Sequence, residues 1–147
     1  MYALRAATDD DWPEIGRVAD EAAPWAGAAN AQWLARRQAF GETGRRRRHY
    51  VATHGGGIVG YGAIEEDADT GRYRLFVVTR ADRLTGGLGD AILELLMSDL
   101  ADLGAREVWM REEARDPLTT FATSHGFSET QRFTYEGQEI VVVERRL

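Results

Sequence analysis

Apolar stretches separated by short glycine-containing or polar turns recur along the chain and predict a protein built largely from β-strands. A glycine turn at 55–57 separates two of these stretches, and a polar segment at 67–71 separates the next two. Seven strands are predicted, over Tyr2–Ala6, His49–His54, Ile58–Glu65, Arg72–Val78, Arg106–Arg111, Phe127–Tyr135 and Gln138–Glu144. The turn at Glu136-Gly137 joins the last two strands into a predicted hairpin.

Four segments predict helices, and the third has the clearest helical period. Asp90, Glu94, Ser98 and Asp102 recur every four residues as its polar side. Thr8 is expected to cap the first helix, with three aspartates in its first turn. The predicted helices run from Thr8 to about Ala23, from about Ala28 to Phe40, from Leu88 to about Leu103 and from Pro117 to Ser124. The order β-α-α-β-β-β-α-β-α-β-β predicts an α+β or mixed α/β fold around one central sheet, in a single domain over residues 1–147.

Composition limits the functions open to this chain. Of its 147 residues, 44% are hydrophobic and 29% are charged, which is typical of a globular protein. The N-terminal sequence lacks the apolar core of a signal peptide, and no stretch is long enough to span a membrane, so we expect a cytoplasmic protein with no membrane partner. The net charge of −6 argues against nucleic acid as the main partner. The chain has no cysteine, and its three histidines lack a metal-binding spacing, so we expect no thiol nucleophile and no metal.

The segment between the fourth predicted strand and the third helix contains Gly86, Gly87 and Gly89. Glycine permits close approach to the backbone, and the free N–H groups at a helix N-terminus form an anion site. A nucleoside-triphosphate loop would need Gly-Lys-Ser/Thr before the helix, whereas Asp90 follows the last glycine here. A dinucleotide-binding loop would need a third glycine where Ile92 stands, and a place near the first strand. The segment therefore matches neither loop.

Two segments resemble signatures of the GNAT superfamily of acyl-CoA-dependent N-acetyltransferases. The segment from Arg83 to Gly89 resembles the loop Arg/Gln-x-x-Gly-x-Gly/Ala, with one residue too many before the Gly-Leu-Gly step. Either Gly86 or Gly87 can therefore be its first glycine. The segment Phe121-Ala122-Thr123-Ser124-His125-Gly126-Phe127 resembles the C-terminal signature Phe-Tyr-x-x-x-Gly-Phe. The element order also resembles that family along nearly the whole chain.

This resemblance implies a fold, a reaction and a cofactor site. The fold would be a single, mostly antiparallel central sheet of about seven strands with helices on both faces. The reaction would transfer an acetyl group from acetyl-CoA to an amine of a small molecule or peptide. The loop amides would hold the CoA pyrophosphate, and the backbone N–H of Val78 or a neighbour would polarise the thioester carbonyl. The residues expected to bind the cofactor are Val78, Arg83, Gly86, Gly87, Leu88, Gly89 and Asp90.

The same resemblance raises the question of proton transfer. Many family members carry a tyrosine that protonates the departing CoA thiolate, and this chain has Ala122 at that position. His125 is the nearby candidate for the role. Transfer to nitrogen also needs a neutral amine, so a carboxylate must help to remove a proton, and Glu65 and Glu66 are the candidates.

Trp25 and Trp33 lie in the helical region that covers the acceptor cleft in this family, where they would line a substrate pocket or pack in the core.

Two functions stay open from the sequence. The first is an N-acetyltransferase, acting as a monomer or homodimer. The second is a non-catalytic acyl-CoA-binding or protein-interaction domain, which the alanine at position 122 favours.

Overall fold

The computed structural model describes residues 2–22, 47–67, 70–80, 87–114 and 118–147. Trp25, Trp33, Arg83, Gly86 and the helix expected over 28–40 therefore lie outside the described residues. The described elements are β1 (Ala3–Ala6), the 3₁₀ helix η1 (Asp9–Asp11), α1 (Trp12–Ala22), β2 (Arg47–His54), β3 (Gly57–Glu66), β4 (Tyr73–Thr79), α3 (Leu88–Asp102), β5 (Glu107–Glu113), α4 (Leu118–Ser124), β6 (Ser128–Tyr135) and β7 (Gln138–Arg146).

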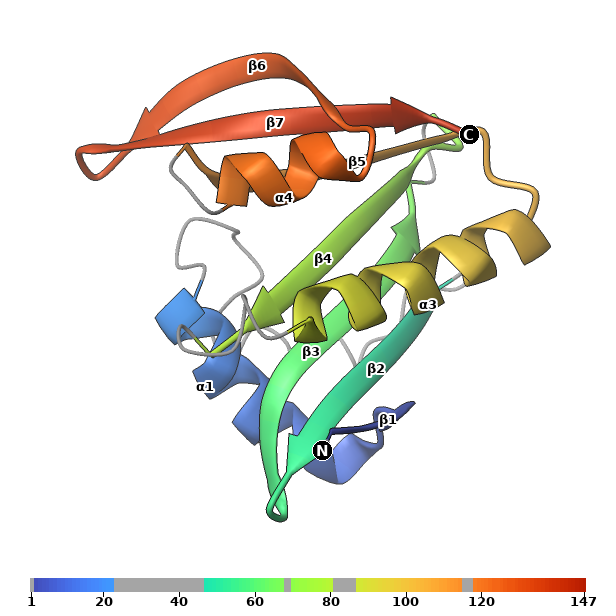
Figure 1. Cartoon of the computed structure of the whole chain (residues 1–147), viewed down its shortest axis with the longest axis vertical. Coiled ribbons are helices and arrows are strands. Elements are labelled where there is room, and N and C mark those ends of the chain that lie inside the picture. The colour runs from blue at the N-terminus through green and yellow to red at the C-terminus, as the bar shows by residue number, and fades with distance from the viewer. Residues whose placement is uncertain (1, 23–46, 68–69, 81–86, 115–117) are drawn as a thin grey trace.

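All seven predicted strands lie in one sheet, in the order β1-β2-β3-β4-β5-β7-β6 (Figure 1). Every neighbouring pair is antiparallel except β4 and β5, which are parallel. The chain passes from β4 to β5 through α3, as a parallel connection requires. The expected single, mostly antiparallel sheet is therefore confirmed, and the predicted strand ends differ from the structure by at most two residues.

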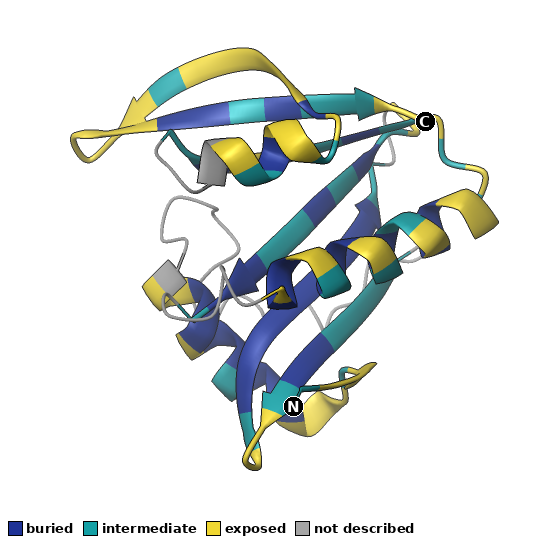
Figure 2. Ribbon diagram, in the orientation of Figure 1, coloured by how far each residue is buried: buried dark blue, intermediate teal, exposed yellow. Residues whose placement is uncertain are grey.

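Helices cover both faces of the sheet, as expected. On one face, α1 packs Ile15 and Val18 against Val51 and Tyr61 of the central strands. On the other face, α3 and the shorter α4 lie side by side (Figures 1 and 2). The α3 side chains in that layer include Ile92, which is 1% exposed. Two apolar cores therefore sandwich β3 and β4, and these two strands are held firmly in place.

Two glycines in β3 set how closely α3 approaches the sheet. A Cβ atom added at Gly60 would lie 3.0 Å from Ile92 Cδ1 and 3.3 Å from Leu88 Cδ2. At Gly62 it would overlap Ile92 Cγ2 outright. The absent side chains let the first three turns of α3 sit almost on the backbone of β3. The position of the α3 N-terminus, relative to the ends of the strands, follows from this contact.

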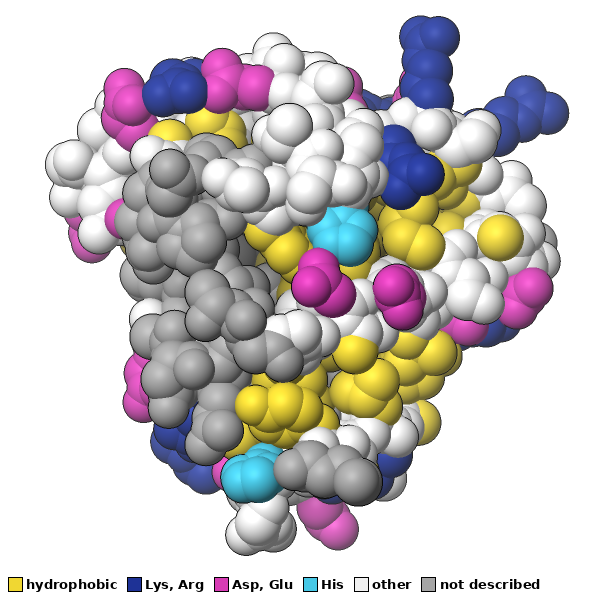
Figure 3. All heavy atoms as spheres, viewed as in Figure 1, with side chains coloured by type: hydrophobic (Ala, Val, Ile, Leu, Met, Phe, Trp, Pro, Cys, Tyr) yellow, Lys and Arg dark blue, Asp and Glu magenta, His cyan; other side chains and the backbone are white. Residues whose placement is uncertain are grey.

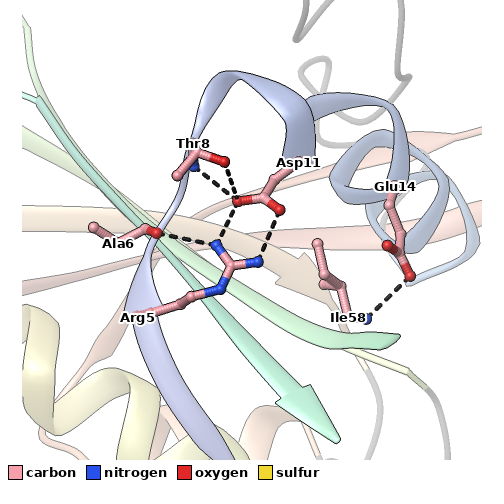
Figure 4. A network of polar contacts seen from close by, with 6 residues as sticks. All are labelled: Arg5, Ala6, Thr8, Asp11, Glu14 and Ile58. Atoms are coloured by element: carbon pink, nitrogen blue, oxygen red, sulfur yellow. Dashed lines mark hydrogen bonds and ion pairs between the residues drawn. The ribbon is translucent and has the colours of Figure 1, made fainter. Parts of the chain in front are cut away.

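Thr8 caps the first helical segment, as predicted, and the Asp11 carboxylate turns back toward it (Figure 4). Its carboxylate accepts hydrogen bonds from the Thr8 backbone N–H at 2.8 Å and from Arg5 Nη1 at 2.6 Å. The hydrogen bond from Arg5 holds the pKa of Asp11 well below its ordinary value of 3.8. The three aspartates consequently form the 3₁₀ turn η1, and α1 begins only after them. Glu14 of α1 then accepts the Ile58 N–H at 3.0 Å, which ties the helix to β3.

The close α3–β3 contact predicts a large difference between two glycine-to-alanine substitutions in one strand. Gly62→Ala forces its new methyl group into Ile92 and should lower the free energy of unfolding by about 1–3 kcal/mol. Gly57→Ala is the control, because its Cβ would meet nothing closer than 3.8 Å. Urea denaturation of both variants measures the difference. Equal stability of the two variants would contradict the packing described here.

Candidate functional site

The sheet splits where β4 and β5 part. These strands share only two ladder positions, Tyr73 with Val108 and Arg74 with Trp109. Each strand keeps its other neighbour, since β4 pairs with β3 as far as Thr79 and β5 pairs with β7 along its whole length. Figure 1 shows β4 running away from the part of the sheet that contains β7. We call this divergence, flanked by residues 75–79 and 110–113, the β4–β5 split.

Strand edges in the split carry backbone groups that pair with no other strand in the described part of the chain. Alternate N–H and C=O groups of residues 75–79 face β5, which has moved out of hydrogen-bonding range. Such an edge can accept an extended molecule that has amide groups of its own, in the way an added strand would. The split is therefore able to bind a narrow ligand rich in amides.

The N-terminus of α3 lies at the open end of the split. Leu88 packs beside Gly60, and Gly60 is the ladder partner of Thr79, the last residue of β4. Gly87 precedes the helix with φ +81°, a conformation that glycine adopts without strain. The first helical hydrogen bond runs from the Ala91 N–H to the Gly87 carbonyl, at 3.0 Å. The N–H groups of residues 88–90 thus have no acceptor within the helix, and their place near the end of β4 would let them bind an anion there.

The structure brings His125 and Asp90 together, although they are far apart in sequence. His125 Nε2 lies 2.7 Å from Asp90 Oδ1, so the end of α4 is bound to the first turn of α3. The His125 ring also lies 4.9 Å from the Phe121 ring. Figure 3 shows a histidine beside acidic side chains on this face, with hydrophobic side chains around them. The imidazole therefore already has a carboxylate partner.

Glu65 and Glu66 lie at the paired end of the split. Their ladder partners on β4 are Arg74 and Tyr73, the two residues that still pair with β5. Val78 is four residues further along β4, or about 13 Å. Glu65 is buried on the face that α1 covers, whereas Glu66 accepts the Tyr73 hydroxyl at 2.9 Å. A surface pocket at this end includes Glu66 and Arg72 in its lining, and it lies near the C-terminus of α3 rather than its N-terminus.

Ala122 and Glu112 share the face of the sheet that α3 and α4 cover. Ala122 is 1% exposed and belongs to the same apolar core as Val108 and Met110 of β5. Strand alternation puts Glu112 on this face too, where it is 6% exposed. Glu112 Oε1 has no hydrogen-bond partner, and burial raises the pKa of this carboxyl from 4.5 to about 8.

Glu112 is the residue that sequence reasoning missed. Its signal was present, because Val108 and Met110 alternate as buried positions and Glu112 continues that alternation. A carboxylate at a position where the pattern demands an apolar side chain is a candidate functional group.

Arginine and aromatic side chains gather on the opposite face of β4 and β5. The Arg74 guanidinium lies 4.2 Å from the centre of the Phe76 ring and 5.1 Å from that of Trp109. Arg111 lies 5.6 Å from Trp109 and 5.7 Å from Phe133. These distances are those of cation–π contacts, and they place arginine and aromatic side chains on the α1 side of the sheet, next to the split.

The described residues form neither a metal-binding cluster nor a membrane-spanning helix. No three histidine or acidic side chains lie close enough together there to hold a metal ion. None of the helices described is long and apolar enough to cross a membrane.

Comparison with known proteins identifies the fold. The chain is similar to a GNAT-family protein of Desulfovibrio desulfuricans, with TM-score 0.74 and 20% identity over 99% of each chain. It is similar to the ribosomal-protein-S18-alanine N-acetyltransferase of Escherichia coli, with TM-score 0.76 and 22% identity over 99% of this chain and 94% of that one. It is also similar to the PaiA N-acetyltransferase of Thermoplasma acidophilum in complex with coenzyme A, with TM-score 0.73 and 13% identity over 100% and 99% of the two chains.

These likenesses give the chain the GNAT fold, as its sequence signatures predicted. No family model and no curated protein sequence matches the chain.

The burial of Glu112 predicts an unusual dependence of stability on pH. Because its folded-state pKa is raised, wild-type stability should fall as the pH rises from about 4.5 through about 8. Glu112→Gln removes the ionisation, so it should match the wild type near pH 5. At pH 9 it should be more stable by on the order of 1–3 kcal/mol. Urea denaturation at the two pH values measures this. A stability difference that does not change with pH would contradict the burial of a titrating carboxyl.

Proposed function

We propose that this protein is an N-acetyltransferase that moves the acetyl group of acetyl-CoA to the amine of a small molecule or peptide. The observation that carries the proposal is the meeting of two features at one place. The split between β4 and β5 ends at the free amides of the α3 N-terminus. The GNAT fold supports the same reaction, since the similar proteins are acetyltransferases and one was solved with coenzyme A.

The proposed binding mode follows the chemistry of coenzyme A. Its pyrophosphate carries negative charge and would sit on the backbone amides of the segment from Arg83 to Asp90, at the positive end of the α3 dipole. Its pantetheine arm contains two amides and would run along the unpaired edge of β4. The N–H of Val78 or a neighbour would then donate to the thioester carbonyl and stabilise its developing negative charge.

The proposed transfer needs the amine to reach the thioester in neutral form. Glu65 or Glu66, about 13 Å along the sheet from Val78, would accept its proton through a chain of waters from the paired end of the split. The arginine–aromatic surface on the α1 side lies where the acceptor would approach, together with Trp25 and Trp33 if these line the pocket. His125 would have to leave Asp90 to act as an acid, so we do not assign it an essential role.

The second candidate is a domain that binds acyl-CoA without turning it over. One observation favours it, namely that Ala122 stands buried where a tyrosine would supply the proton. A thiol is acidic enough to depart without a dedicated acid, however, since a free cysteine thiol has a pKa of roughly 8.5. Turnover therefore separates the two candidates, whereas CoA binding alone does not.

Glutamates placed at the two ends of α3 test CoA binding. Gly87 and Gly104 flank this helix with φ +81° and +71°, and a Cβ at either meets nothing within 4 Å. Gly87→Glu and Gly104→Glu therefore introduce the same charge and similar backbone strain. Only the former puts a carboxylate against the proposed pyrophosphate site, so it should weaken CoA binding at least about tenfold, or 1.4 kcal/mol. Calorimetry that finds equal CoA affinity in the two variants would place the pyrophosphate elsewhere.

Thiol release from acetyl-CoA tests the reaction. A panel of amino acids, peptides, polyamines and aromatic amines should contain acceptors that raise release above the rate without amine, with acetylated product seen by mass spectrometry. With such an acceptor, His125→Ala should keep kcat within about tenfold of the wild type. CoA binding without release for any amine would favour the non-catalytic domain. A thousandfold loss in His125→Ala, with CoA affinity unchanged, would make His125 the acid.

A further inference from the structure

We propose that Glu112 is the general acid that protonates the departing CoA thiolate, taking the role that Ala122 leaves vacant. This inference rests on the proposed acetyl transfer. It begins from a carboxyl group that is 94% buried with an unsatisfied oxygen, on the stretch of β5 that has lost β4 as its neighbour. Such a group costs stability, which points to a functional reason for keeping it.

The position of Glu112 suits a donor on the β5 side of the split. Glu112 pairs with Val141 on β7, so its other flank is the one from which β4 has departed. α4 packs over β5 and brings Ala122 to the same face. The methyl group of Ala122 cannot donate a proton, so on this face Glu112 is the buried group that can. A thioester that enters the split between the strands would thus pass a carboxyl from β5 in place of a phenol from α4.

The protonation state also suits a donor. No charged neighbour contributes to the raised pKa of Glu112, whose cause is burial alone, and at about 8 the carboxyl stays protonated at neutral pH. That value lies close to the pKa of a free thiol, roughly 8.5, where proton transfer between the two is nearly balanced.

The ionisable groups on this face have partners of their own. Described α4 residues carry no ionisable side chain. His125, which follows α4, is bound to Asp90 of α3. Arg145 of β7 donates to the His125 carbonyl at 2.8 Å. From β4, Tyr73 donates to Glu66.

The step conserves atoms and charge. The amine lone pair attacks the thioester carbon, the C–N bond forms, and the C–S bond breaks with its electron pair on sulfur. Sulfur takes the proton of the Glu112 carboxyl and leaves as the free thiol. The nitrogen loses one proton to solvent, and the Glu112 carboxylate regains one from solvent, so the enzyme returns to its starting state.

Titration of CoA bound to the protein tests this contact without any acceptor. The ultraviolet absorbance of the thiolate is followed against pH for three proteins with saturating CoA. If Glu112 faces the sulfur, the two groups share protons, and in the wild type the thiolate should form in two steps over a wide pH range. In Glu112→Gln the thiol titrates alone in one step. Glu107→Gln is the control, because it removes a carboxylate of the same strand that lies outside the split and on the opposite face, and it should keep the two-step curve.

The outcomes separate this inference from the proposed function. If the thiol of bound CoA titrates in the same single step in all three proteins, Glu112 does not act on the sulfur, and the proposal of acetyl transfer is unaffected. Failure of CoA to bind the wild type would overturn both. With an acceptor, Glu112→Gln should lower kcat about tenfold to a hundredfold at unchanged KM for acetyl-CoA. An unchanged kcat in Glu112→Gln would also overturn the role.

Discussion

Two parallel strands that share only two ladder positions leave the facing edges of both without partners along the rest of their length. In this sheet the remaining neighbours, β3 and β7, hold β4 and β5 in place on either side of the divergence. The backbone edge of β4 is thereby kept available for a ligand. The walls of the split are strands, and two apolar cores pack against them.

The anion-binding end of the site depends on a second contact, between α3 and the glycines of β3. Because Gly60 and Gly62 have no side chains, α3 lies against the strand, and its first turn reaches the end of β4. A larger distance between α3 and β3 would place the free amides of the α3 N-terminus away from the split. Gly60 and Gly62 of β3 therefore act together with Gly87, because all three glycines determine where α3 begins relative to the sheet.

Most of the fold followed from sequence because its signals are local. Strand patterns, turn glycines and the four-residue period of α3 each act over a few residues, and the resulting elements agree with the structure. The split itself could not be derived in this way, because the β4–β5 ladder pairs residues that are 35 positions apart. The contact between Asp90 and His125, which are also 35 residues apart, could not be predicted from local sequence patterns for the same reason. Glu112 lies one residue beyond the strand end predicted at Arg111, where the alternation of Val108 and Met110 continues. Interpreting it needed the burial that only the packed sheet supplies.

The central claim is that the split between β4 and β5 binds acetyl-CoA with its pyrophosphate on the α3 N-terminus. A crystal structure of the protein with coenzyme A tests it most directly. The account predicts the pantetheine arm between residues 75–79 and 110–113, and pyrophosphate oxygens within hydrogen-bond distance of the amides of residues 87–90. Coenzyme A bound elsewhere on the protein, with the split filled by the protein's own side chains, would contradict it.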